Sequence, residues 1–167
     1  MFKQVQRIPY QICEFNPGKY HLKETVNLAM KQGDCRHKSL LLYNLLQQNT
    51  FNAKYIKVIF DWKDLPIPAE ILGILKKSGT RWSHDALSVQ INDNFSVNVD
   101  CTWNLELKRK GFPVTEDWDG ESHTKQITNG VLEIYLAEGF KNSEHDINVD
   151  KGEALKFAEE LNKWLMK

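Results

Sequence analysis

Apolar residues are densest between positions 35 and 48. The segment contains five leucines on several sides of a helix: Leu40, Leu41, Leu42, Leu45 and Leu46. A helix that is apolar nearly all round is usually buried, so this segment predicts a core helix. Gly33 favours a tight turn before it, and Asp34 is a favoured N-cap because its carboxylate accepts from free backbone N–H groups. The pattern predicts a turn that opens into a buried helix, with Cys35 in the first helical turn.

Four segments combine alternation with β-branched or aromatic residues and predict strands. They are residues 53–60, 84–91, 95–100 and 131–136. Turn-forming residues separate the second and third strands at positions 92–94, which predicts a hairpin.

Three further segments predict helices. Residues 21–31 have apolar positions near helical spacing, and residues 69–77 follow Pro66 and Pro68 and end before Gly79, a natural C′ residue. A last helix begins at Asp150, where Glu153 completes a capping box. Its apolar stripe consists of Phe157, Leu161, Trp164 and Leu165.

The remaining segments are connections. Residues 1–20 predict an extended arm anchored by Tyr10, Ile12 and Phe15, and residues 104–130 and 139–149 predict irregular chain. Residues 61–83 form a long insert, which is either a binding loop or lid, or a plain surface excursion. No repeat or linker divides the sequence, so residues 1–167 predict a single α+β domain.

The hairpin pattern constrains two polar residues. Leu87, Val89 and Ile91 must share a sheet face with Phe95, Val97 and Val99, because a slip of one residue reverses every side chain. The opposite face then carries both His84 and Asp100, which lie directly or diagonally opposite each other. Ala86 and Ser88 on that face are small, so we expect the central helix to pack there and to bring Cys35 near His84.

Composition excludes several classes of protein. The 22 basic residues balance 22 acidic ones, which argues against a strongly basic nucleic-acid surface. No signal peptide and no membrane-spanning apolar stretch are predicted. The three cysteines show no C-x-x-C spacing, which favours free thiols in a reducing cytosol and predicts a cytoplasmic protein without a disulfide framework.

Cys35, His84 and Asp100 together predict a nucleophilic site. A helix N-terminus stabilises a thiolate, an imidazole can move its proton, and a carboxylate can orient that imidazole. Each residue alone has a simpler interpretation: a small buried cysteine, a solvated histidine at a strand start, and an exposed carboxylate at a strand end. Their expected convergence on one face favours the site.

The motifs Gly33-Asp34-Cys35, His84-Asp85-Ala86-Leu87 and Val99-Asp100-Cys101-Thr102-Trp103 resemble the transglutaminase-like superfamily over about residues 22–103. The resemblance implies a papain-like core, in which the helix that carries the nucleophile packs on an antiparallel sheet. It also implies that Cys35 is the nucleophile, His84 the general base and acid, and Asp100 the residue that orients His84. The chain has Asp-Cys-Thr where many relatives have Asp-Pro-Thr.

Other residues are secondary candidates. The backbone N–H of Cys35 could stabilise an oxyanion, with Gln32 or the indole N–H of Trp82 as the second donor. Trp62, Trp82 and Trp103 either line a groove beside the thiol or are core aromatics. We interpret Cys101 as a core residue on the aliphatic face.

Metal and cofactor chemistry is not predicted. Cys35 and His37 lie two residues apart and therefore point about 200° apart on a helix, so they do not converge on an ion. His21, His123 and His145 have no partner pattern and are expected on the surface.

The sequence thus predicts thiol-dependent acyl chemistry on a peptide or protein amide, without a cofactor. Hydrolysis is favoured over cross-linking because the sequence has no additional β-domains to exclude water. The alternative is a catalytically idle domain that binds a protein or peptide through the same groove. The oligomeric state is not predicted.

Overall fold

The computed structural model describes residues 1–14, 31–137 and 147–167 and has a mixed α+β architecture. The helices are α1 (Phe2–Gln6), α3 (Cys35–Gln48), α4 (Ala69–Leu72) and α5 (Lys151–Leu165), with 3-10 helices η2 (Trp62–Asp64) and η3 (Leu105–Lys110). The strands are β1 (Ala53–Asp61), β2 (Arg81–Asn92), β3 (Phe95–Val99) and β4 (Glu133–Ala137). In the described part, no helix has the length and apolar character to cross a membrane.

The strands form an antiparallel sheet in the order β3-β2-β1-β4. The hairpin is confirmed, and Leu87 pairs with Val99 while Val89 pairs with Val97, which is the diagonal register for His84 and Asp100. The pairing register shifts between Gln90 and Asn92, so the side chains at the end of the hairpin no longer follow the alternation of the rest. Phe95 is therefore 45% exposed rather than on the aliphatic face, as the alternation predicted.

The sheet has an apolar cluster on each face. Leu41, Leu42 and Leu46 of α3 pack with Leu87 and Val89. The central helix therefore lies on the aliphatic face, and our expectation that it packs on the small-residue face is wrong. The physical reason is that large leucine side chains bury more apolar area against Leu87 and Val89 than against small residues.

The second cluster fills the other face. It joins Ile56, Val58 and Ala86 of the sheet to Trp103 and to α5. The side chain of His84 lies on this face, because His84 pairs with Val58 in β1 and its ring meets that of Phe60 at 6.0 Å.

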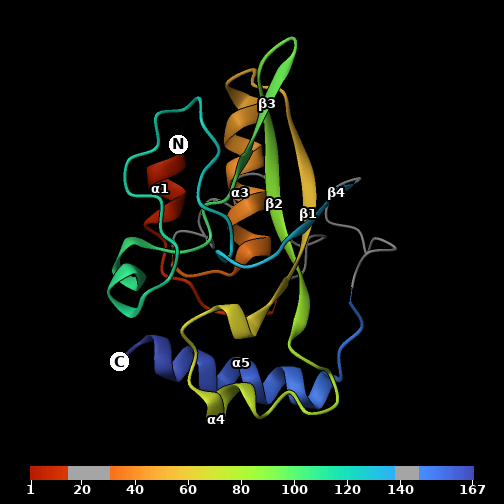
Figure 1. Ribbon diagram of the computed structural model, residues 1–167. Coiled ribbons are helices and arrows are strands. Elements are labelled where there is room, and N and C mark those ends of the chain that lie inside the picture. The colour runs from red at the N-terminus through yellow and green to blue at the C-terminus, as the bar shows by residue number, and fades with distance from the viewer. Residues whose placement is uncertain (15–30, 138–146) are drawn as a thin grey trace.

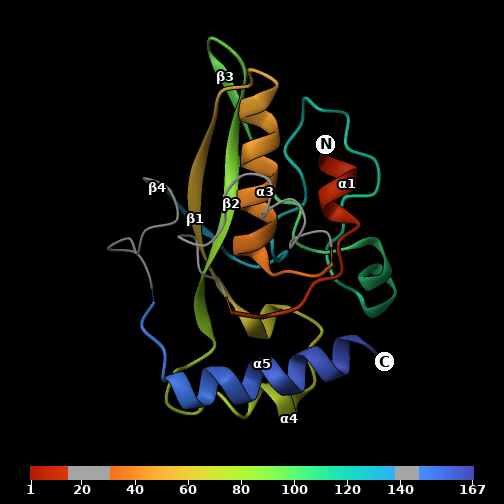
Figure 2. The same ribbon diagram turned by 180° about the vertical axis from the view of Figure 1, so that it is seen from behind.

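The N-terminal segment begins with α1, not with an extended arm as predicted. Phe2 and Val5 on α1 are buried with α3, and Figure 2 shows α1 beside that helix. Tyr10 is buried as expected and pairs with Gly33 through a parallel bridge, and Ile12 packs on the same cluster. Phe15, and residues 21–30 of the predicted helix 21–31, lie outside the described residues, as do residues 138–146 of the connection 139–149.

The 61–83 insert is not a free surface excursion. Its helix α4 ends at Leu72 rather than Lys77, and five apolar side chains of the insert are buried: Trp62, Leu65, Ile67, Ile71 and Leu75. Figure 1 shows α4 beside α5 at one end of the sheet. The insert is therefore part of the core.

The predicted capping box at Asp150 forms only in part. Asp150 caps α5 by accepting from the N–H of Glu153 at 3.0 Å. The Glu153 carboxylate instead accepts from the backbone N–H groups of Lys77 and Ser78. Glu153 thus anchors the loop that leads into β2 to the start of α5.

Candidate active site

Cys35 opens α3, where the sequence predicted it. Asp34 is the N-cap and accepts from the N–H of Arg36 at 3.0 Å, and Cys35 is partly exposed. Gly33 is needed here for space, because a Cβ atom would lie 2.7 Å from the Cβ of His37. In the described ranges, no acceptor is bonded to the Cys35 N–H, so this donor remains available to an oxyanion.

His84 and Asp100 form a buried hydrogen-bonded pair. The distance from His84 Nε2 to Asp100 Oδ2 is 2.8 Å, and both side chains are 2% exposed. The bond uses Nε2, which leaves Nδ1 as the ring nitrogen available to a thiol. The expectation that the hairpin brings His84 and Asp100 within hydrogen-bonding reach is confirmed.

Cys35 completes the constellation. Burial acts to lower the pKa of His84, but the charge of Asp100, the charge of Cys35 and hydrogen bonds to both outweigh it and raise the pKa to about 10. Burial acts to raise the pKa of Asp100, but His84 and Thr102 outweigh it, and the pKa of this carboxyl is lowered. The site is therefore built to hold an imidazolium between a carboxylate and a thiol.

Asp100 is held by residues that the sequence did not reveal as functional. Its Oδ1 accepts from the N–H of Thr102 at 2.9 Å, and its own N–H donates to Thr124 Oγ1 at 2.7 Å. Thr124 belongs to the polar 104–130 segment. It lies next to the end of β3, where its N–H donates to Asn98 O. No local pattern marks Thr124, because this contact spans 24 residues.

A second cysteine, histidine and aspartate meet at the first turn of α3. His37 Nδ1 lies 2.9 Å from Asp34 Oδ1, and His37 Nε2 lies 3.1 Å from Glu14 O and 3.8 Å from Cys13 Sγ. Burial acts to lower the pKa of His37, but Asp34 and Cys13 raise it to about 10.

The two constellations differ in what the imidazole can do. Both nitrogens of His37 face oxygen acceptors, so each of its N–H groups already has an oxygen partner besides Cys13. His84 bonds to an oxygen acceptor through Nε2, and Cys35 is near enough to raise its pKa. The two groups therefore differ in the partners of the imidazole, which are two oxygens and a thiol at His37 but one carboxylate and a thiol at His84.

The secondary candidates are mostly engaged elsewhere. The Trp82 indole N–H donates to Gly79 O at 3.1 Å, which contradicts its expected role as an oxyanion donor. Trp62 and Trp103 are 3% exposed core residues, and the Trp103 N–H donates to Ile127 O. Gln32 is exposed just before Gly33 and remains a candidate second donor.

The other cysteines and histidines have separate places. Cys101 is buried in the aliphatic cluster, as predicted, and all three cysteines are free thiols. His123 is exposed and accepts from the N–H of Asn98, whereas His21 and His145 lie outside the described residues. Within the described ranges, no group of three or more His, Cys, Asp or Glu side chains is placed to hold a metal ion.

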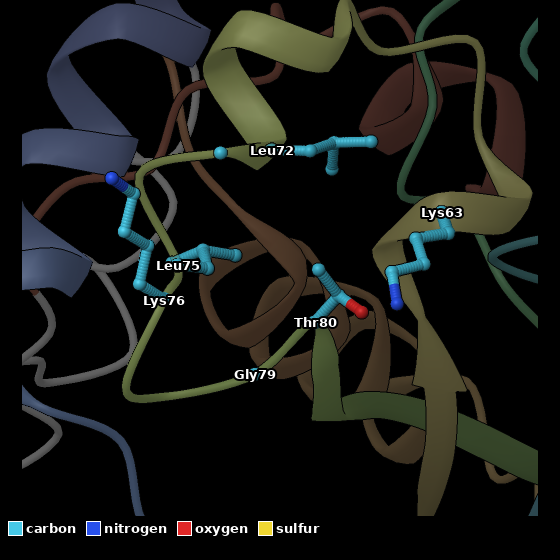
Figure 3. Close-up of a pocket in the computed structure, with 7 residues that line it drawn as sticks. Lys63, Leu72, Leu75, Lys76, Gly79 and Thr80 are labelled. Carbon is cyan, nitrogen blue, oxygen red and sulfur yellow. The ribbon is translucent and has the colours of Figure 1, made fainter.

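A hollow of about 380 Å³ lies beside α4 and the start of β2 (Figure 3). It is lined by Lys63, Leu72, Gly73, Leu75, Lys76, Gly79 and Thr80. Neither Cys35, His84 nor Asp100 lines it, so this hollow is separate from the candidate active site.

Comparisons of the chain with protein-family models, with curated proteins and with solved structures found no match. The likeness to the transglutaminase-like superfamily therefore rests on the residues and their order in the chain.

Proposed function

We propose that this protein performs thiol-dependent acyl chemistry on a peptide or protein amide, in a core of the transglutaminase-like, papain-like kind. The observation that carries the proposal is the placement of His84 between Asp100 and Cys35, with Cys35 at the N-terminus of α3. His84 can carry a proton to and from the groups that react at Cys35, and Asp100 orients the ring. The arrangement has the three parts that a cysteine nucleophile needs.

In the proposed reaction, Cys35 first attacks the substrate and is later released, and His84 first donates a proton and later accepts one. The Cys35 thiolate attacks the amide carbon, and the carbonyl electrons move onto oxygen, where the Cys35 N–H stabilises them. The intermediate collapses as His84 Nδ1–H gives its proton to the leaving amine, which leaves a thioester on Cys35. Neutral His84 then takes a proton from water, whose oxygen attacks the thioester and releases the acid and the thiolate. Asp100 stays ionised and keeps the imidazole oriented.

Hydrolysis is the preferred outcome over transfer to an amine. Transfer requires an amine channel and closure that excludes water from the thioester. The 61–83 insert is packed into the core, which makes it a poor lid. Water is therefore the expected acceptor.

The test offers a panel of glutamine-containing peptides together with a labelled primary amine in excess. We expect hydrolysed product, detected by mass spectrometry, that disappears in Cys35→Ala and His84→Ala. Cys13→Ser is the matched control and should retain activity, because Cys13 contacts His37 rather than His84. Amine incorporation that exceeds hydrolysis and depends on Cys35 would reverse the preference for water.

The second candidate is a catalytically idle domain that binds a peptide or protein. The burial of His84 favours it, because a leaving amine must reach a side chain that is 2% exposed. This candidate predicts no product from any peptide and alkylation of Cys35 no faster than that of Cys13.

A further inference from the structure

Lys38 is a fully buried cation one turn after Cys35 on α3. Its side chain is 0% exposed, and Nζ donates to Gln6 O at 3.1 Å, Ile8 O at 2.9 Å and Thr102 O at 2.7 Å. An ammonium group has three N–H donors, so each donor has one carbonyl acceptor. Such complete pairing offsets the cost of burying a charge.

The three carbonyls belong to segments on either side of the candidate site. Gln6 and Ile8 lead to Tyr10, which pairs with Gly33 just before Cys35. Thr102 lies two residues after Asp100 and donates its N–H to Asp100 Oδ1. The Lys38 ammonium thus connects the helix that carries Cys35 to the turn that holds Asp100.

We propose that Lys38 is a positioning residue for the candidate active site, which fixes the Asp100 turn relative to the first turn of α3. The inference rests on the proposed function of Cys35, His84 and Asp100. Without the ammonium, three buried carbonyls lose their donor, and the Thr102 backbone is free to shift. Since Thr102 N–H orients Asp100, the shift reaches His84 through the Asp100 carboxylate.

The charge of Lys38 is maintained near neutral pH. Burial lowers the pKa of Lys38 to about 8, and the nearby Cys101 and Asp100 partly oppose this effect. At pH 7.0, the pH of the measurements, the Lys38 side chain is therefore largely in its protonated, charged form.

The experiment compares Lys38→Met with Leu42→Ala in the full chain. Methionine fills similar volume without donors, whereas Leu42→Ala weakens the packing of the same helix and leaves the ammonium in place. One readout is the downfield proton NMR signal of His84 Nε2–H, assigned by its absence in Asp100→Asn. The other is the rate of Cys35 alkylation by iodoacetamide at pH 7.0.

We expect Lys38→Met to lose or shift the downfield signal and to slow Cys35 alkylation roughly tenfold, because small displacements of reacting groups are costly. Leu42→Ala should keep both readouts once it is measured below its unfolding temperature. If Lys38→Met does not fold, Lys38→Gln serves instead, since an amide can donate to at most two of the three carbonyls. It should show smaller changes of the same kind.

An unchanged downfield signal in the folded Lys38 variant would overturn the inference, as would an equal loss in Leu42→Ala. Failure of the proposed function gives a different result. In that case the wild-type protein forms no product and Cys35 is no more reactive than Cys13, while the His84 signal still reports whether Lys38 positions the pair.

Discussion

Replacing Asp100 with asparagine removes one charge from the buried pair and preserves its shape. The asparagine side chain can still accept from the Thr102 N–H, but it no longer carries the charge that opposes the burial of His84. We expect the pKa of His84 to fall well below about 10, because the charge and hydrogen bond of Asp100 no longer oppose the effect of burial and only Cys35 still does so. The imidazole should then lose its proton at a lower pH than in the wild-type protein.

The size of the effect follows from the shift itself. A change from 6.5 to about 10 in the pKa of His84 corresponds to about 5 kcal/mol between its two protonation states. The lowered pKa of Asp100 arises from the same contact, so it is not added. Because the folded pKa is the higher one, this stabilisation is complete below pH 6.5 and is lost as the pH rises through 10. About 3 kcal/mol remains at pH 7.5 by the same linkage.

The assay has two parts. Side-chain NMR of labelled histidine should follow the His84 titration in both proteins, and urea unfolding from pH 6 to 10 should show a steeper loss of stability in the wild-type protein than in Asp100→Asn. His37 has a raised pKa and contributes with the same sign in both proteins. Lys38 has a pKa of about 8 that Asp100 also raises, so the histidine NMR titration assigns the change to His84 and the unfolding data follow the site as a whole. A His84 that still titrates near pH 10 in Asp100→Asn would refute this reasoning.

Two further substitutions test the supports of the site. Gly33→Ala places a Cβ atom 2.7 Å from the Cβ of His37, so we expect a loss of about 1–3 kcal/mol in urea unfolding; unchanged stability would show that the first turn of α3 can move. Thr124→Val leaves the buried Asp100 N–H without its acceptor, so we expect a loss of about 1–3 kcal/mol and slower Cys35 alkylation; unaltered alkylation would show that Thr124 supports the fold alone.

Local patterns predicted the elements that carry the site. The apolar run and the Asp34 cap located α3 from Cys35 to Gln48, because the cap marks the first turn and the leucines follow within the same short stretch of sequence. The alternation in the hairpin placed His84 and Asp100 on one face, because the side-chain period of a strand is two residues. The contact between His84 and Asp100, which lie 16 residues apart, could thus be predicted from the alternation within each strand.

Long-range contacts were beyond those patterns. The partners of Lys38 lie 30 to 64 residues away in the sequence, and nothing near Lys38 distinguishes it from an ordinary exposed lysine. The Glu153 carboxylate fits a capping box by spacing, yet it bonds to Lys77 and Ser78 because the loop before β2 packs on α5. The face chosen by α3 depended on the total apolar area of each sheet face, which no single strand displays.

The point at which β3 ends explains how Cys35 can lie near His84 although the rest of α3 packs on the opposite face of the sheet. The leucines of α3 pack on the aliphatic face, whereas the side chain of His84 lies on the other face. β3 ends at Val99 and pairs with β2 only from Leu87 onward, so β2 has no β3 partner at His84. In Figure 1 the N-terminal end of α3 extends past this end of β3. The first turn of α3 can therefore reach His84 around the uncovered edge of β2, and the chain leaving β3 supplies Asp100 at the same place. A longer β3 would pair with β2 at His84 and separate the thiol from the imidazole.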